Sequence, residues 1–284
     1  MQSSGLTSDY ERDGFVFPIT VFDAGEAARM RQQLEIIEQT KFAACPSENV
    51  GKLLRVNAHY LFPLVYDAAS DARVLNAVES LIGPNILIYS AEFFIKEPAT
   101  TKHVSWHQDL TYWGLGETDD EVTAWIALSD VTTQAGCMRF IPGSHNRAIQ
   151  PHTDTFAADN QLSRGQELAV EIDESIAVSA VLKPGQMSLH HGRLFHASGP
   201  NRSSDRRIGL AIRYVTPEVR QQVAGEDYAI LVRGTDHSGN WIHVSSPKDN
   251  VDPNDLQRYR RIRDIQKIAL AQGLSNPASM YKGS

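Results

Sequence analysis

Apolar residues recur at helical spacing in three segments of the chain. In residues 24–39 they fall every three or four positions behind Asp23, a residue type that commonly caps the start of a helix. The same spacing runs through residues 70–81, where Gly83-Pro84 ends it, and through residues 254–272. These patterns predict amphipathic helices toward both ends of the chain.

Short apolar runs rich in β-branched and aromatic residues fill the middle of the chain, and turn signals such as Pro184-Gly185 separate them. Together with one run before the first helix, they are residues 14–22, 85–94, 122–128, 137–141, 168–170, 177–182, 187–191 and 208–215. Residues 53–61 alternate between apolar and polar side chains, which predicts a further edge strand. Short strands without helices between them indicate a sandwich or barrel rather than a parallel sheet.

We therefore expect a mainly β protein with α-helices added at its N- and C-terminal ends. Residues 1–284 are predicted to form a single domain, because no repeat, low-complexity tract or linker divides them. The β core is expected over about residues 85–216, with the helical additions over about 23–82 and 253–272.

The charge balance limits the partners of such a protein. With 27 Lys and Arg against 34 Asp and Glu, the formal net charge is −7, which argues against binding nucleic acid or an anionic membrane through bulk charge. No apolar run approaches the roughly 20 residues that span a bilayer, and the polar N-terminus lacks the apolar region of a signal peptide. We expect a cytoplasmic protein that acts on a small molecule, and no pattern specifies its oligomeric state.

The chain contains 2 cysteines and 10 histidines, so a transition metal would be bound by imidazole and carboxylate rather than by thiolate. In the segment Trp106-His107-Gln108-Asp109, an extended backbone places every second side chain on the same face. His107 and Asp109 are therefore two predicted ligands of one metal.

Residues 185–215 are predicted to run as strand, turn and strand. Symmetric pairing about the turn places His196 opposite Arg207 and turns Arg206 to the other face. His196 is thus the predicted third ligand, and His190, on the same face, competes with it. Two histidines and one carboxylate with open positions suit a non-haem Fe(II) oxygenase, in which the arginine would bind a 2-oxo acid. The same three ligands also suit zinc in a hydrolase.

Several motifs of this chain occur together in one known family. They are His107-Gln108-Asp109, Pro142-Gly143-Ser144-His145, and His196-Ala197-Ser198-Gly199-Pro200-Asn201 followed by Arg207. In this combination the chain resembles the phytanoyl-CoA dioxygenase family of Fe(II)/2-oxoglutarate-dependent oxygenases, from about Ser8 to about Thr216. The resemblance implies a double-stranded β-helix, a cupin-like jelly roll, which agrees with the strand pattern.

The resemblance also implies which residues hold the cofactors. Fe(II) would be bound by His107, Asp109 and His196. The distal carboxylate of 2-oxoglutarate would be bound by Arg207 and Ser198, Gln108 would support the metal ligands, and O₂ would be the other cosubstrate. Halogenases of the family replace the carboxylate ligand with a small residue. Because Asp109 is present, hydroxylation is favoured over halogenation.

Other side chains are predicted to wall the site. Trp125 shares a strand face with Thr123 and is expected beside the cosubstrate, although core packing explains it equally well. The residues predicted at the substrate pocket are cationic, aromatic or hydrogen-bonding: Arg55, Asn57, His59, Tyr112, Trp113 and Arg213.

These residue types favour a small polar substrate, and the leading expectation is a small aminophosphonate or a related zwitterion. Betaine-like compounds, amino-acid derivatives, natural-product intermediates and acyl-CoA are alternatives. Acyl-CoA is less favoured because the sequence shows no basic cluster for a nucleotide tail. A zinc-dependent hydrolase would leave Arg207 unexplained, and a non-catalytic jelly-roll binding protein would leave the three ligands unexplained.

Overall fold

The computed structural model describes residues 3–274 of the chain. Its helices are α1 (Ser3–Asp13), α2 (Ala24–Gln39), α3 (Val50–Leu54), α4 (Pro63–Ser70), α5 (Ala72–Ile82) and α6 (Pro253–Leu270), with 3₁₀ turns η1 (Ala58–Tyr60), η2 (Asp109–Tyr112), η3 (Ser144–Asn146) and η4 (Glu174–Ile176). Its strands are β1 (Phe15–Thr20), β2 (Ile86–Lys96), β3 (Val104–His107), β4 (Glu121–Ala127), β5 (Met138–Phe140), β6 (His152–Asp154), β7 (Gln166–Leu168), β8 (Val178–Ala180), β9 (Gln186–His191), β10 (His196–Ser198), β11 (Arg207–Val215), β12 (Tyr228–Arg233) and β13 (Ile242–His243).

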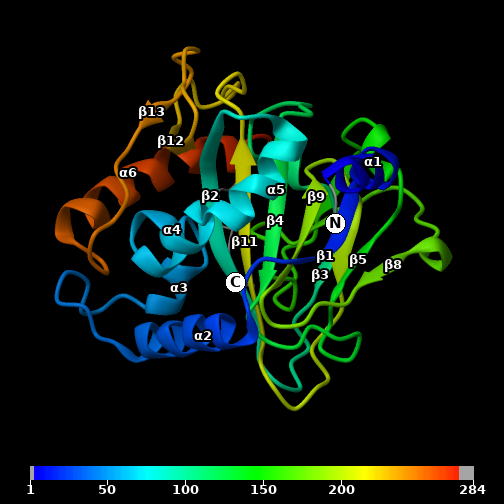
Figure 1. Cartoon of the computed structure of the whole chain (residues 1–284), viewed down its shortest axis with the longest axis horizontal. Coiled ribbons are helices and arrows are strands. Elements are labelled where there is room, and N and C mark those ends of the chain that lie inside the picture. The colour runs from blue at the N-terminus through cyan, green and yellow to red at the C-terminus, as the bar shows by residue number, and fades with distance from the viewer. Residues whose placement is uncertain (1–2, 275–284) are drawn as a thin grey trace.

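Two main sheets form the centre of the molecule (Figure 1). The larger sheet has the strand order β1-β9-β4-β11-β2-β12-β13, and the smaller has the order β3-β10-β5-β8. Side chains from both sheets share one buried cluster, which contains Trp125 and Ala211 from the larger sheet and Phe140 from the smaller. The arrangement is the jelly roll expected from the strand pattern, with added helices.

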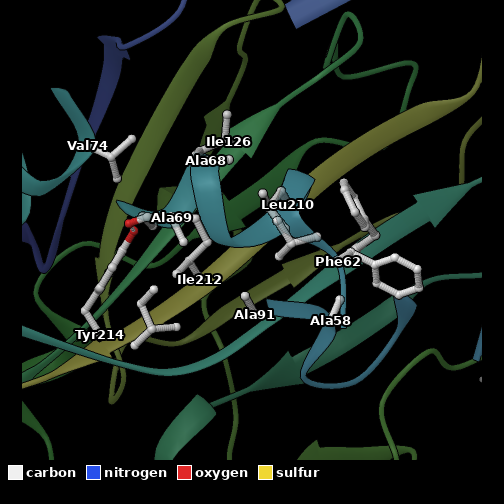
Figure 2. Close-up of a cluster of buried hydrophobic side chains, with 14 of the residues drawn as sticks. Ala58, Phe62, Ala68, Ala69, Val74, Ala91, Ile126, Leu210, Ile212 and Tyr214 are labelled. Atoms are coloured by element: carbon white, nitrogen blue, oxygen red, sulfur yellow. Dashed lines mark hydrogen bonds between the residues drawn. The ribbon is translucent and has the colours of Figure 1, made fainter. Parts of the chain in front are cut away.

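Alternate residues of β11 point to opposite sides of the larger sheet. Leu210, Ile212 and Tyr214 pack against helices α4 and α5 in the main hydrophobic core (Figure 2). Burial of each such side chain contributes about 1.5–3 kcal/mol. Arg207 and Arg213 point the other way, into the space between the two sheets. The helix layer therefore closes one face of the sheet and leaves the inner face for polar groups.

A β-bulge in β2 adds a side chain to that inner face. Arg213 pairs with Ser90 and the next residue, Tyr214, pairs with Ile88, so Tyr89 is the extra residue. Because of this bulge, Tyr89 and Ser90 both line the same cavity although they are neighbours in sequence.

The three predicted amphipathic helices are confirmed as α2, α5 and α6. At the start of α2, Asp23 and Glu26 form a reciprocal capping box: the Glu26 backbone N–H donates to the Asp23 carboxylate at 2.7 Å, and the Glu26 carboxylate accepts from the Asp23 N–H at 2.8 Å. Within residues 3–274, none of the helices is both long and apolar enough to cross a bilayer.

Two sequence expectations about secondary structure are wrong. Residues 53–61 do not form an edge strand but lie in α3 and η1, joined through Asn57 with a left-handed φ of 51°. Leu53 and Leu54 are both buried in the main core, which strand alternation does not permit. The larger sheet also extends outside residues 85–216, because β1 pairs with β9 and β12 pairs with β2.

Candidate metal centre

Strand pairing in the smaller sheet brings two histidines together. His107 is the last residue of β3 and His196 is the first residue of β10, and the two are direct partners in the antiparallel ladder. Their ring centroids lie 4.0 Å apart. Asp109 follows at the start of η2, where the chain leaves the strand and its carboxylate reaches both imidazoles.

The three side chains converge on one point. Asp109 Oδ1 lies 3.2 Å from His107 Nε2 and 3.7 Å from His196 Nε2. One ligand atom from each residue lies within 4.8 Å of the others, and no second group of this kind occurs in residues 3–274. The predicted pair His107 and Asp109 therefore does share one site, and the structure places His196 with it.

Backbone carbonyls set the orientation of both imidazoles. His107 Nδ1 lies 2.9 Å from the Ser105 carbonyl and His196 Nδ1 lies 3.0 Å from the Leu194 carbonyl. A carbonyl oxygen only accepts, so each Nδ1 carries a hydrogen and each Nε2 is turned toward the common point. Burial, with His107 beside it, holds the pKa of His196 well below its usual range, which keeps this imidazole neutral.

The second oxygen of Asp109 is held by other groups. Thr123 Oγ1 donates to Oδ2 at 3.2 Å, and His190 Nε2 and Arg213 Nε each lie 3.8 Å from it. Burial opposes the charge of this carboxylate, but Arg213 and the histidines outweigh burial and hold the pKa of Asp109 well below its usual range. Asp109 is therefore a carboxylate with Oδ1 free for a metal.

The donor set fits a divalent first-row metal. Two imidazoles and one carboxylate offer three nitrogen and oxygen ligands from one side, which leaves positions for small molecules on the other. His190, the predicted competitor, contacts the outer oxygen of Asp109 and is not part of the ligand group.

A narrow chamber of about 30 Å³ adjoins the three ligands. Its walls include three residues predicted at the cosubstrate site, Trp125, Ser198 and Arg207. Arg207 is 1% exposed, donates to the Gly136 carbonyl at 3.1 Å and lies 5.2 Å from the Trp125 ring centroid. Burial lowers the pKa of Arg207 to about 9, so an anion in the chamber would stabilise its charge.

Lys96 is a residue of this site that the sequence analysis missed. It is buried, and its Nζ donates to Ser198 Oγ at 2.6 Å and to the Gly199 carbonyl at 2.6 Å. Burial and the neighbouring Arg207 lower the pKa of Lys96 to about 5. The alternation of β2 places Lys96 on the same face as Phe94, but only the pairing of β2 with β11 places it beside Arg207.

The predicted pairing of His196 with Arg207 is wrong. β10 pairs with β3 and β5 in the smaller sheet, whereas β11 pairs with β2 and β4 in the larger sheet. His196 and Arg207 still line one chamber because the two sheets face each other. Arg206 does point away, toward Glu38, to which it donates at 2.8 Å.

Two predicted site residues lie away from both cavities. The Gln108 side chain donates to the Arg193 carbonyl at 2.8 Å and accepts from the Gln150 N–H at 2.7 Å, so it holds the segment beside the metal ligands rather than facing the metal. His59 is fully buried in η1, and burial lowers its pKa to about 3. It lines neither cavity.

A larger cavity of about 480 Å³ opens on the other side of the metal ligands. Five of the residues predicted at the substrate pocket line it: Arg55, Asn57, Tyr112, Trp113 and Arg213. Arg213 forms an ion pair with Glu92, and its guanidinium lies 5.2 Å from the Trp113 ring centroid. Helix α6 closes one side through Gln266, which accepts a hydrogen bond from Asn57 Nδ2 at 2.6 Å.

Comparison with known proteins finds a matching family and relatives that are similar in sequence. The family model described as phytanoyl-CoA dioxygenase (PhyH) matches residues 10–209. A curated relative from Stutzerimonas stutzeri, named probable alpha-ketoglutarate-dependent hypophosphite dioxygenase, is 26% identical over 225 residues, which are 74% of this chain and 77% of the relative. Phytanoyl-CoA dioxygenase domain-containing protein 1 from Danio rerio is 29% identical over 154 residues, about half of each protein (52% of both).

Among solved structures, the non-haem monooxygenase ThoJ in its apo form superimposes with a TM-score of 0.84 at 32% sequence identity. The alignment covers 94% of this chain and 98% of that one. It therefore extends beyond the jelly roll to include the helical additions.

Proposed function

This chain belongs to the phytanoyl-CoA dioxygenase family of Fe(II)/2-oxoglutarate-dependent dioxygenases, and from that premise we propose that it hydroxylates an unactivated C–H bond of a small polar substrate. This proposal rests on one observation: the two cavities adjoin the same group of metal ligands. The narrow chamber and the larger cavity share His107 and Asp109 in their walls, together with Phe94 and Arg213. A cosubstrate on one side and a substrate on the other thus reach the same metal.

In this proposal His107, Asp109 and His196 hold Fe(II) through two Nε2 atoms and one carboxylate oxygen. When bound, the iron supplies the redox chemistry by which O₂ converts 2-oxoglutarate to succinate and CO₂ and oxidises the substrate. The protein positions the ligands: the carbonyls of Ser105 and Leu194 orient the two imidazoles.

The narrow chamber is proposed to hold the distal carboxylate of 2-oxoglutarate. Arg207 would bind the distal carboxylate, with Trp125 as an aromatic wall. Because Lys96 donates to Ser198 Oγ, the hydroxyl hydrogen of Ser198 is available to donate to the same carboxylate. Within residues 3–274, Asp109 is the one acidic residue in the chamber wall, and it faces the metal. The part of the chamber lined by Arg207 therefore has no acidic side chain, and an acidic cosubstrate would supply the negative charge there.

The larger cavity is proposed to hold the substrate, with Arg55, Asn57, Tyr112, Trp113 and Arg213 in its wall. A small aminophosphonate or related zwitterion is the first substrate class to test, since the cavity presents guanidinium groups and aromatic rings together. The phosphorus oxyanion in the name of the Stutzerimonas relative supports an anionic substrate.

We also propose that residues 1–284 act as one domain. The substrate cavity is walled by α3 near the N-terminus and by α6 near the C-terminus, in addition to strands of the jelly roll. Neither helical addition can be removed without opening the proposed substrate site.

Anaerobic addition of Fe(II) and 2-oxoglutarate tests the proposed site. We expect a weak visible charge-transfer band, which should be absent when either component is omitted. Under O₂, succinate formation should rise with one member of a panel of small phosphonates, quaternary amines, amino acids and organic acids. Absence of the band, together with no succinate from any panel member, would exclude the proposed function.

A further inference from the structure

Charge is unevenly distributed along the substrate cavity. Its wall contains five basic residues and two acidic ones: Lys52, Arg55, Lys102, Arg213, Arg263, Glu92 and Asp109. Both acidic residues lie at the inner end beside Arg213, which forms an ion pair with Glu92 and faces Asp109 at 3.8 Å. Arg213 therefore faces both carboxylates at that end.

The outer end of the cavity is basic. Lys52 is exposed and Lys102 and Arg263 are half-buried, whereas His107, Asp109 and Arg213 at the inner end are buried. These three residues come from α3, from the segment between β2 and β3, and from α6. Neither Lys52 nor Lys102 forms an ion pair with any residue in the range 3–274. Three segments distant in sequence thus build a basic mouth.

The space between the two ends suits an organic molecule. A volume of about 480 Å³ lies within the range of pockets for organic ligands and far exceeds the volume of an ion of a few atoms. Tyr89, Phe94 and Trp113 line this space. Arg55 also lies there, 4.4 Å from the Phe94 ring centroid. The cavity wall thus combines aromatic side chains, two of which (Phe94 and Trp113) lie beside Arg213 at the inner end, with neutral polar residues such as Gln161.

We propose that the substrate is an organic anion whose charged group lies at the mouth between Lys52, Lys102 and Arg263. This proposal rests on the proposed function, and it replaces the small aminophosphonate as the expected substrate class with a larger organic anion whose charged group is remote from the oxidised carbon. The carbon that is oxidised lies at the inner end beside His107 and Asp109, where Phe94 and Trp113 can contact an apolar part of the substrate. In a small oxyanion such as hypophosphite, by contrast, the oxidised atom itself belongs to the charged group.

The basic mouth corrects an expectation from the sequence, which showed no basic cluster. Lys52, Lys102 and Arg263 are each isolated along the chain, and the fold brings them together. Arg263 lies on α6, outside the residues 10–209 that match the family model, so this part of the mouth is not defined by the family pattern.

Binding of an aromatic anion and its neutral analogue tests the proposal. The probes are 2-naphthoate and 2-naphthamide, titrated calorimetrically into the protein loaded anaerobically with Fe(II) and 2-oxoglutarate. We expect the carboxylate to bind about tenfold more tightly than the amide at low salt, and the difference to shrink at high salt. The double variant Lys52→Ala/Lys102→Ala should lose about tenfold in naphthoate affinity and leave naphthamide affinity unchanged.

Lys248→Ala provides the matched control, because Lys248 is exposed and lies outside the cavity wall. Equal affinities for the two probes, no naphthoate binding, or an equal loss in Lys248→Ala would overturn the proposal. These results are separate from failure of the proposed function, because the charge-transfer band of Fe(II) and 2-oxoglutarate does not depend on Lys52 or Lys102. A normal band without anion preference rejects the basic mouth alone.

Discussion

Lys96 is the direct cross-strand partner of Arg207, so two basic side chains lie side by side on the inner face of the larger sheet. Neither forms an ion pair within the described residues, and both have a lowered pKa because they are buried. Lys96 is instead held by Ser198 and the Gly199 carbonyl. Arg207 in the chamber wall, with Lys96 behind Ser198, supports the proposal that the narrow chamber binds a carboxylate.

Removal of either basic group should weaken 2-oxoglutarate binding. We expect Arg207→Ala to raise the 2-oxoglutarate dissociation constant roughly 100-fold, because a buried charge-assisted pair is lost, and Lys96→Met to raise it roughly tenfold. Calorimetric titration of the Fe(II)-loaded protein measures both. Arg206→Ala is the control, since Arg206 is bound to Glu38 outside the chamber, and an equal loss in this variant would contradict the assignment.

The stability of the ligand-free protein should depend on pH through Lys96. Its pKa is about 5 in the folded protein and about 10.4 when unfolded, so between these values the unfolded chain binds the additional proton. Stability from this group therefore rises with pH, by at most about 1.4 kcal/mol per pH unit.

Urea unfolding of the wild type and Lys96→Met from pH 6 to pH 9 tests this dependence. The variant lacks the titrating group, so the unfolding free energy of the variant minus that of the wild type should decrease as pH rises. A difference that stays constant across the range would show that Lys96 keeps an ordinary pKa in the folded protein.

The third metal ligand can be identified by comparing two histidine variants. His196→Ala should reduce Fe(II) affinity 100-fold or more, because it removes a direct ligand. His190→Ala should reduce it by about tenfold, because this side chain lies beside Asp109 and the His196 ring and so acts through the ligands. Equilibrium dialysis with Fe(II) under anaerobic conditions gives both values. A larger loss in His190→Ala would reverse the assignment.

A methyl group at Gly209 should disturb the chamber through Trp125. A Cβ placed at Gly209 would lie 1.7 Å from Trp125 Cζ2, so Gly209→Ala must displace the indole ring that lines the chamber. We expect a loss of about 1–3 kcal/mol in unfolding free energy, together with weaker 2-oxoglutarate binding. Thermal unfolding and calorimetric titration measure the two effects.

Gly5→Ala is a suitable comparison for that variant, because nothing lies within 4 Å of the corresponding Cβ position in helix α1. It should be neutral or stabilise the protein by about 0.5–1 kcal/mol. If Gly209→Ala behaved in the same way, Trp125 would have room to move and would not define the chamber wall.

Local patterns in the sequence were sufficient for much of the fold. The helical spacing behind Asp23 and the short β-branched runs depend on neighbours within a few residues, and α2, α5, α6 and most core strands lie where these patterns place them. Residues 53–61 are the exception. Their apparent alternation was overridden by packing, since the buried Leu53 and Leu54 are adjacent in sequence and only a helix accommodates both in the core.

The kinds of chemical group available at the site are readable from local motifs: two imidazoles and a carboxylate, followed by an arginine. Which strands bring these groups together depends on how the two sheets pack. β10 and β11 follow one another in the chain but belong to opposite sheets, so Arg207 lies beside Lys96 rather than opposite His196. The basic mouth formed by Lys52, Lys102 and Arg263 has the same origin. Contacts between distant segments depend on how whole sheets and helices pack, and no local periodicity encodes that packing.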